Sequence, residues 1–212
     1  MKSSRPHADA LLQQYQARYD EGLLPLAEEL QLHIAGLFKG HERVDRVSVR
    51  AKAPDSFMKK AFVAGEVDLK YDDPISQIQD QIGARIITFY KSDVDRIDAL
   101  IKKYFKPIEF KDRVPESEWE FGYFGRHYVL VMPSDVKVDH IDFAHIPDFF
   151  ELQIKTLFQH AWSEANHDLG YKSDGALLKP DEKRKLAFTS AQAWGADQIF
   201  DELFQVRGQG TS

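Results

Sequence analysis

Residues 149–162, FFELQIKTLFQHAW, constrain the fold of this chain more than any other stretch. The first eight alternate, so one face of a strand would carry only apolar side chains, those of Phe150, Leu152 and Ile154. The other face would carry Glu151, Gln153 and Lys155. Thr156 then stands where a helix would be capped, and the pattern changes to helical spacing. A carboxylate and an amide on the wet face of a strand that feeds a helix predict one wall of an active site.

Composition bounds the class of protein. The chain has 212 residues, enough for one domain with helical additions, and its 43% hydrophobic residues can fill a core. The absence of cysteine excludes disulfides and thiolate metal sites. A net charge of −6 excludes a protein that binds nucleic acid over its whole surface. Without an apolar run of membrane-spanning length or a signal sequence, we expect a cytoplasmic protein with no membrane partner.

The N-terminal block is expected to be helical. Residues of about 6 to 38 place apolar side chains at three- and four-residue steps, with a break near Gly22 and Pro25. The pattern therefore favours two helices, and Gly40 ends the block.

The next segment predicts a basic turn. Residues 44–52 alternate as a strand, and Pro54–Ser56 opens a helix over 57–63. Cations and a hydroxyl gather at this strand-to-helix turn: Arg50, Lys52, Ser56, Lys59 and Lys60. Together with free N–H groups at a helix start they would form an anion cradle, while a solvated charged edge is the alternative interpretation.

An acidic residue, Asp80, precedes a strand that is predicted to be buried. Asp73-Pro74 begins a short helix to about Gln79, and residues 82–89 then predict a strand with four buried side chains, Ile82, Ile86, Ile87 and Phe89. Asp80 lies at the mouth of this strand, either as a turn residue or as an oxygen ligand for Mg²⁺. Arg85 is expected to point away from the apolar set.

The rest of the chain alternates packing elements with one aromatic loop. We expect a helix over 94–105 capped by Ser92 or Asp93, a strand over 107–114, an acidic loop over 115–120 and a strand over 128–132. Between the last two lies Gly-Tyr-Phe-Gly-Arg-His, residues 122–127. It is either a hairpin turn with a packed ring or a ring held out to stack on a base. Helices over 156–169 and 180–205 complete the pattern.

Four motifs in order point to a family. They are Arg50-x-Lys52-x-x-x-Ser56-x-x-x-Lys60, Asp80-x-x-Gly83-x-Arg85, Gly122-Tyr123-x-x-x-His127 and Glu151-x-Gln153-Ile154-x-Thr156, and Trp162, His167, Tyr171 and Lys172 close the set. Over about Arg43 to Lys172 the chain resembles the synthetase domain of the RelA/SpoT family, in the form of a stand-alone small alarmone synthetase.

The resemblance implies a fold and an activity. The fold would be α/β (α+β): a nucleotidyltransferase-like mixed β-sheet flanked by helices, with helical extensions over 1–42 and 179–212 around a synthetase domain over 43–178. The activity would be transfer of pyrophosphate from ATP to the 3′-hydroxyl of GDP or GTP with Mg²⁺, making the alarmone (p)ppGpp. In phosphoryl transfer, positioning and charge neutralisation count for more than covalent catalysis.

The resemblance also assigns roles. Asp80 and Glu151 would be the catalytic acids and metal ligands, with Glu151 accepting the acceptor's 3′ proton. ATP would be bound by the residues of the basic turn and by Arg85: Arg50, Lys52, Ser56, Lys59, Lys60 and Arg85. Arg50 and Arg85 would stack on its adenine. The acceptor nucleotide would be bound by aromatic and polar side chains: Tyr123, Arg126, His127, Gln153, Asn166, His167 and Tyr171.

The acceptor side departs from the family pattern. The family's Lys before Gly-Tyr is absent, and Tyr123 is followed by Phe124-Gly125-Arg126 where the family has Arg-Ser. A guanine nucleotide remains the first expectation. The alternatives are the tRNA 3′ CCA end or an adenosine nucleotide, as in toxic small alarmone synthetases, and a catalytically inactive nucleotide-binding module. A homo-oligomer and an antitoxin protein are further partners consistent with the resemblance.

Overall fold

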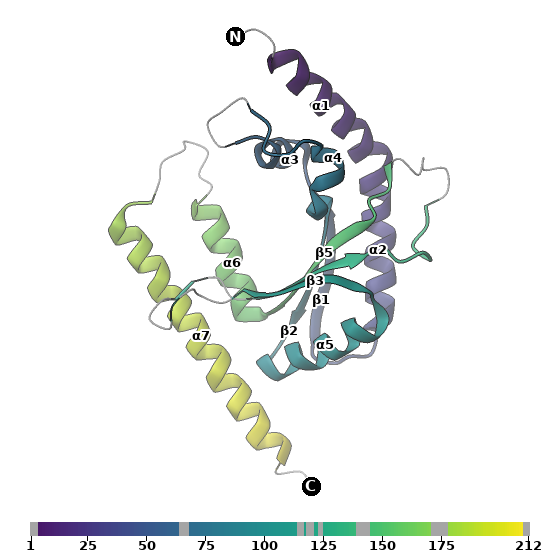
Figure 1. Ribbon diagram of the computed structural model, residues 1–212. Helices are drawn as coiled ribbons and strands as arrows, with labels where there is room; N and C mark the ends of the chain where they lie inside the picture. The colour runs from purple at the N-terminus through teal and green to yellow at the C-terminus, as the bar shows by residue number, and fades with distance from the viewer. Residues whose placement is uncertain are drawn as a thin grey trace.

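A five-stranded mixed sheet organises the molecule (Figure 1). The computed structural model describes residues 4–63, 68–113, 117, 121–122, 125–138, 145–170 and 178–209. The strands are β1 (Val44–Ala51), β2 (Ile82–Thr88), β3 (Pro107–Arg113), β4 (Gly125–Val131) and β5 (Phe149–Thr156), in the spatial order β1-β2-β5-β4-β3. β2 and β5 run parallel, and the other neighbours run antiparallel. The predicted mixed sheet flanked by helices is confirmed.

Strand β5, which contains the alternating residues 149–156, is the central strand of this sheet. Phe150, Leu152 and Ile154 of β5 are fully buried, as their alternation predicts. Thr156 caps α6 (Leu157–Gly170), because its hydroxyl accepts a hydrogen bond from the backbone N–H of Gln159 at 3.1 Å. The strand-to-helix prediction is therefore confirmed.

Helices cover one face of the sheet to form the core. α2 (Leu24–Leu37) and α5 (Lys91–Tyr104) lie against it, as Figure 1 shows. Their buried side chains pack on the inward residues of β2, β4 and β5 in one hydrophobic cluster that includes Leu26, Leu30, Ile34, Ile97 and Ile101. Burying these side chains is the main stabilising contribution, at about 1.5–3 kcal/mol for each large one.

The N-terminal block is helical without a gap. α1 (Ser4–Arg18) passes through a π-helical turn, Tyr19–Leu23, into α2. The expected break near Gly22 is thus a local widening of one helical run. A Cβ on Gly22 would lie 2.6 Å from the Cβ of His145, so only glycine allows this close approach. Gly40, with φ of 90°, follows the block as predicted.

Short helical elements connect β1 to β2. α3 (Pro54–Ala61) follows β1, while α4 (Pro74–Gln77) and a 3₁₀ turn, Gln79–Gln81, precede β2. The side chain of Asp73 caps α4 by accepting from Ser76 N–H at 3.3 Å. α7 (Pro180–Gln209) packs beside α6 and ends the described chain.

Three details differ from the sequence prediction. α5 begins at Lys91, with Tyr90 as its cap position, so neither Ser92 nor Asp93 is the cap. Phe89 is 36% exposed because β2 has ended and its ring lies outside the core. Lys155 is only 2% exposed, although the alternation placed it on the wet face, because α6 folds back over that end of the sheet. None of the described helices is both long and apolar enough to cross a bilayer.

Candidate active site

Two acidic side chains from distant parts of the sequence line the same cavity. Asp80 comes from the 3₁₀ turn before β2 and Glu151 from β5, and the cavity between them measures about 340 Å³. Lys60 of α3 and His127 of β4 line it as well. The pairing of both acids in one cleft, on which the sequence interpretation depended, is therefore found.

Asp80 is held by two cations. One carboxylate oxygen, Oδ2, lies 3.0 Å from Nζ of Lys52 and 2.9 Å from Nζ of Lys60. The other oxygen, Oδ1, is buried and has no hydrogen-bond partner within the part of the chain that is described. A buried carboxylate oxygen without a partner costs about 1–3 kcal/mol, so this atom is suited to a cation that arrives with the substrate.

The N-terminal helix supports this turn. The hydroxyl of Tyr15 donates to the carbonyl oxygen of Lys52 at 2.8 Å, and its ring stacks on Phe57 with centroids 3.6 Å apart. Arg18 donates through Nε to the side-chain oxygen of Gln81 at 2.8 Å, one residue after Asp80. These positioning residues could not be identified from the sequence, because nothing local in a helical repeat indicates a polar partner on a distant turn.

Glu151 is held by one residue of the neighbouring strand β4 and one of its own strand. Its Oε1 lies 2.8 Å from Nδ1 of His127, and its Oε2 accepts from Gln153 Nε2 at 3.3 Å. Burial raises the pKa of Glu151, but the hydrogen bonds from His127 and Gln153 outweigh it and hold the pKa below the ordinary value. Glu151 is therefore ionised at neutral pH, as a general base must be.

The two predicted arginines lie on the same face of the sheet as Glu151. Arg50 pairs with Gly83, and Gly83 pairs with Glu151, so the three form one row across β1, β2 and β5. Arg85 pairs with Gln153 in the next row. Its guanidinium donates to Glu164 at 2.7 Å and lies 3.3 Å from Nδ1 of His160, so α6 fixes its position.

Four other predicted residues lie outside the lining of this cavity. Ser56 and Lys59 are exposed on α3, next to Lys60, and neither lines the cavity. Asn166 is half-buried and His167 exposed towards the C-terminal end of α6, also away from its lining. Tyr123 and Tyr171 fall outside the described residues.

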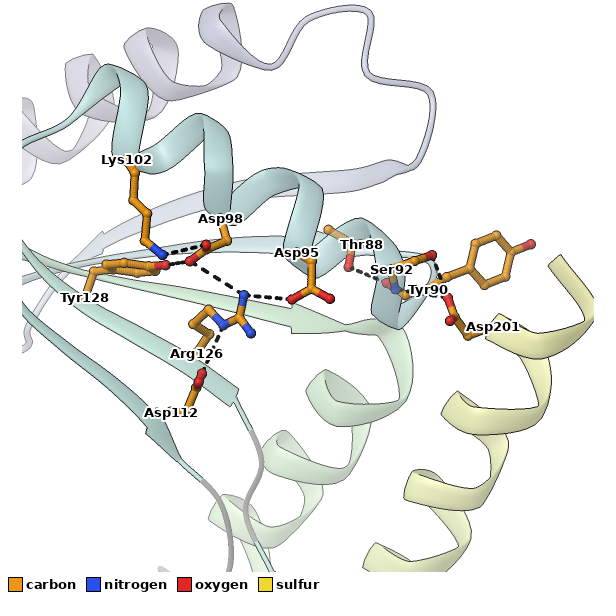
Figure 2. A network of polar contacts seen from close by, with 10 residues as sticks. All are labelled: Thr88, Tyr90, Ser92, Asp95, Asp98, Lys102, Asp112, Arg126, Tyr128 and Asp201. Atoms are coloured by element: carbon orange, nitrogen blue, oxygen red, sulfur yellow. Dashed lines mark hydrogen bonds and ion pairs between the residues drawn. The ribbon is translucent and has the colours of Figure 1, made fainter. Parts of the chain in front are cut away.

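Arg126 lies apart from this group. Neighbouring residues of a strand point to opposite faces, so Arg126 lies on the side away from His127. Figure 2 shows it between α5 and β3, where its guanidinium contacts Asp95 at 3.0 Å, Asp98 at 3.5 Å and Asp112 at 2.9 Å. The structure thus separates Arg126 from the other predicted acceptor residues.

A buried lysine adds to the polar face. Lys155 of β5 is nearly inaccessible, and burial followed by repulsion from Arg85 lowers its pKa to about 7. Sequence reasoning placed it on the wet face and gave it no role.

The residues present fit a magnesium ion. Among the described residues, no three His, Asp or Glu side chains converge to hold a metal by themselves. Magnesium, however, is usually bound by one or two carboxylates together with substrate phosphates and water. The unpartnered Oδ1 of Asp80, beside two lysines that can turn to phosphate, is such a partial site.

Comparison with known proteins decides the family. Residues 49–176, more than half of the chain, match the model described as a region found in RelA and SpoT proteins. This chain belongs to the RelA/SpoT family. It is 26% identical over 193 residues to the GTP pyrophosphokinase YjbM of Bacillus subtilis, which covers 86% of this chain and 83% of that protein.

Solved structures of RelA/SpoT relatives share the fold. The small alarmone synthetase 1 of Bacillus subtilis superposes with a TM-score of 0.72 at 21% identity, covering 93% of this chain and 97% of that one. A structure of the same enzyme bound to its product pppGpp gives 0.65 at 24% identity, covering 88% and 93%. These likenesses confirm the predicted fold class and the resemblance to small alarmone synthetases.

Proposed function

We propose that this RelA/SpoT protein is an ATP:nucleotide 3′-pyrophosphokinase that makes (p)ppGpp from GDP or GTP. The observation that carries the proposal is the single cavity lined by Asp80, Glu151 and Lys60, with Lys52 bonded to Asp80. The name of the relative YjbM, GTP pyrophosphokinase, supports the same reaction class.

The chemistry follows from these groups. The 3′-oxygen of the acceptor attacks the β-phosphorus of ATP, the bond from that phosphorus to the α–β bridging oxygen breaks, and AMP leaves. Glu151 accepts the proton of the attacking hydroxyl. Lys52 and Lys60 neutralise the phosphate charge that develops, and Arg50 and Arg85 hold the adenine by stacking. Bound through Asp80 and Glu151, Mg²⁺ would supply further charge neutralisation for the pyrophosphate.

The acceptor side is carried by fewer residues than the sequence suggested. His127 and Gln153 lie beside Glu151, and Tyr123 is proposed to stack on the acceptor base. Arg126 is left out, because its three carboxylate partners hold it on the other side of the sheet.

The test is a product assay with a panel of acceptors. The protein is incubated with ATP labelled in the β- and γ-phosphates, with and without Mg²⁺, and with GDP, GTP, ATP alone or deacylated tRNA. Label in pppGpp or ppGpp, dependent on Mg²⁺, is the expected result. Label in tRNA or in an adenosine product, with none in guanosine nucleotides, would replace the guanine acceptor. No labelled product from any acceptor would favour an inactive nucleotide-binding module.

Self-association is a further proposal on the partner side. α7 exposes large apolar side chains, among them Phe188, Ile199, Leu203 and Val206, each more than half exposed. These exposed apolar side chains support a homo-oligomer. An antitoxin protein is the alternative partner for the same apolar surface. Light scattering of the purified protein, with Leu203→Glu for comparison, distinguishes a stable oligomer from a monomer.

A further inference from the structure

One side of helix α7 contacts three other parts of the fold. Its residues recur at steps of four, three and four, so they lie along one stripe of the helix: Ser190, Trp194, Asp197 and Asp201. The last two bind the ends of β5 and α5, and the first two contact the segment that precedes β4. The stripe thus connects that segment to the framework of the sheet.

The two aspartates dock α7 on the framework. Oδ2 of Asp197 accepts from the hydroxyl of Thr156 at 2.7 Å, where β5 passes into α6, and both side chains are buried. Oδ1 of Asp201 accepts from the backbone N–H of Ser92 at 2.9 Å and from its hydroxyl at 2.6 Å (Figure 2). Hydrogen bonds to charged groups contribute about 1.5–3 kcal/mol each, so α7 is a firm support at this place.

Ser190 extends this support to a residue far away in the sequence. Its side chain is 1% exposed, and its hydroxyl donates to the carbonyl oxygen of Gly122, 68 positions earlier, at 2.7 Å. A buried hydroxyl without an acceptor costs about 1–3 kcal/mol, so the arrangement that keeps this bond is favoured. The carbonyl of Gly122 is therefore fixed against α7.

Trp194 contacts the residue before this glycine. Its ring and that of Phe121 have centroids 5.9 Å apart and planes at 64°, which is an edge-to-face pair. Such a pair contributes about 0.5–1.5 kcal/mol beyond the area that it buries. Both rings remain partly exposed. Two successive residues, Phe121 and Gly122, are thus bound by one face of one helix.

The bound segment leads directly into the acceptor side of the proposed site. Gly122 is followed in the sequence by Tyr123, and β4 begins at Gly125 and carries His127, which bonds Glu151. A residue spans at most about 3.3–3.6 Å of chain, so a fixed Gly122 limits the reach of the residue after it. The hold of α7 on Gly122 therefore bears on the group proposed to stack on the acceptor base.

We propose that Ser190 and Trp194 are positioning residues for the acceptor nucleotide, acting through Gly122 and Phe121. The inference rests on the proposed function and deepens it, because it gives α7 a part in acceptor recognition. None of the described residues of α7 lines the cavity of Asp80 and Glu151. Loss of the contacts should therefore weaken binding of the acceptor and leave binding of ATP nearly unchanged.

The first experiment separates the two substrates by steady-state kinetics. For Ser190→Ala and Trp194→Ala, KM is measured for ATP and for the acceptor that the product assay labels, with GDP or GTP expected. The KM for the acceptor should rise about fivefold to tenfold, and the KM for ATP should change less than about twofold. Trp194→Phe keeps an aromatic ring beside Phe121 and should recover most of the loss caused by Trp194→Ala.

Two neighbouring positions of α7 give matched controls. Thr189→Ala removes a hydrogen bond that α7 makes elsewhere, the one that the threonine accepts from the indole of Trp162 at 3.1 Å. Phe188→Ala removes a ring that is 64% exposed. Both controls should leave the two KM values within about twofold of the native ones. Thermal unfolding identifies the folded variants, and since Ser190 and Trp194 hold different residues, either folded variant is sufficient for the test.

Hydrogen exchange gives a readout that needs no turnover. Backbone amides in peptides that contain Phe121 and Gly122 should exchange at least about threefold faster in Ser190→Ala than in Thr189→Ala. An unchanged KM for the acceptor, whatever the exchange rate, or equal rises in both KM values would overturn the positioning role and leave Ser190 a packing residue. A native protein that labels no acceptor would instead overturn the pyrophosphokinase activity on which the inference rests.

Discussion

His127 and Glu151 are joined across neighbouring strands, with Nδ1 of the histidine 2.8 Å from Oε1 of the carboxylate. The register aligns His127 with Gln153, so the histidine reaches Glu151 along a diagonal of the sheet, while Gln153 bonds the second carboxylate oxygen. Two strands thus fix the orientation of one carboxylate, which is what a base needs in order to meet a hydroxyl held in one position.

Replacing Glu151 with Gln should remove turnover and preserve ATP binding. The amide keeps the size of the side chain but cannot accept the proton, so kcat should fall at least about a hundredfold. The Kd for ATP, measured by calorimetry, should stay within about threefold. Turnover close to the native rate would mean that another group is the base.

Replacing His127 with Ala should lower kcat more than it changes ATP affinity. Glu151 would lose the partner that fixes Oε1, and we expect a loss of about tenfold to a hundredfold. His127→Asn, which can still donate a hydrogen bond, should retain more activity than Ala. Equal losses for both variants would argue that the imidazole contacts the acceptor itself.

Replacing Arg126 with Met should affect stability and leave acceptor recognition intact. Asp98, whose side chain is only 14% exposed, would lose one cationic partner and retain Lys102 and the hydroxyl of Tyr128 (Figure 2). We expect the free energy of unfolding to fall by about 1–3 kcal/mol. The KM for the acceptor should change less than twofold; a large rise would restore the acceptor role that the sequence predicted.

Much of the architecture could be predicted because local patterns agree with the fold. The alternation of Phe150, Leu152 and Ile154, followed by Thr156 as a cap, is confirmed as the central strand and its helix. Both depend on interactions between residues close in sequence. The convergence of Asp80 and Glu151 required the family resemblance, because no spacing rule brings together residues 71 positions apart.

Other features depend on packing between distant elements and could not be predicted. Arg126 and His127 are adjacent in sequence, and only the pairing of β4 decides that they serve opposite faces of the sheet. Likewise, Tyr15 and Arg18 read as ordinary helix residues until α1 is placed against Lys52 and Gln81. Lys155 follows the polar alternation, yet α6 covers it.

Tyr15 allows a test of this long-range support. Tyr15→Phe removes the hydrogen bond to the Lys52 carbonyl and keeps the ring that stacks on Phe57. We expect a loss of stability of about 1 kcal/mol and a weaker ATP affinity, because Lys52 is bonded to Asp80. Tyr19→Phe, one turn further along the helical run, is the control. Unchanged ATP affinity would limit Tyr15 to a packing role.

The buried amine of Lys155 should make stability depend on pH. Its folded pKa, about 7, lies below the ordinary value of 10.5, so between these values the unfolded chain holds a proton that the folded chain lacks. The free energy of unfolding should therefore rise with pH across this window, by at most about 1.4 kcal/mol per unit. Lys155→Met removes the penalty and should stabilise the protein on the order of 2 kcal/mol at pH 7, and by less at pH 9.

Urea unfolding at both pH values measures this difference, with exposed Lys39→Met as the control. The native protein and the control should show the same rise in stability between pH 7 and 9, because the control variant keeps the buried amine of Lys155. If Lys155→Met kept that rise, another group would be responsible. If it destabilised the protein at pH 7, Lys155 would instead be stabilised as a cation by Glu164 and Glu151, the two carboxylates that raise its pKa.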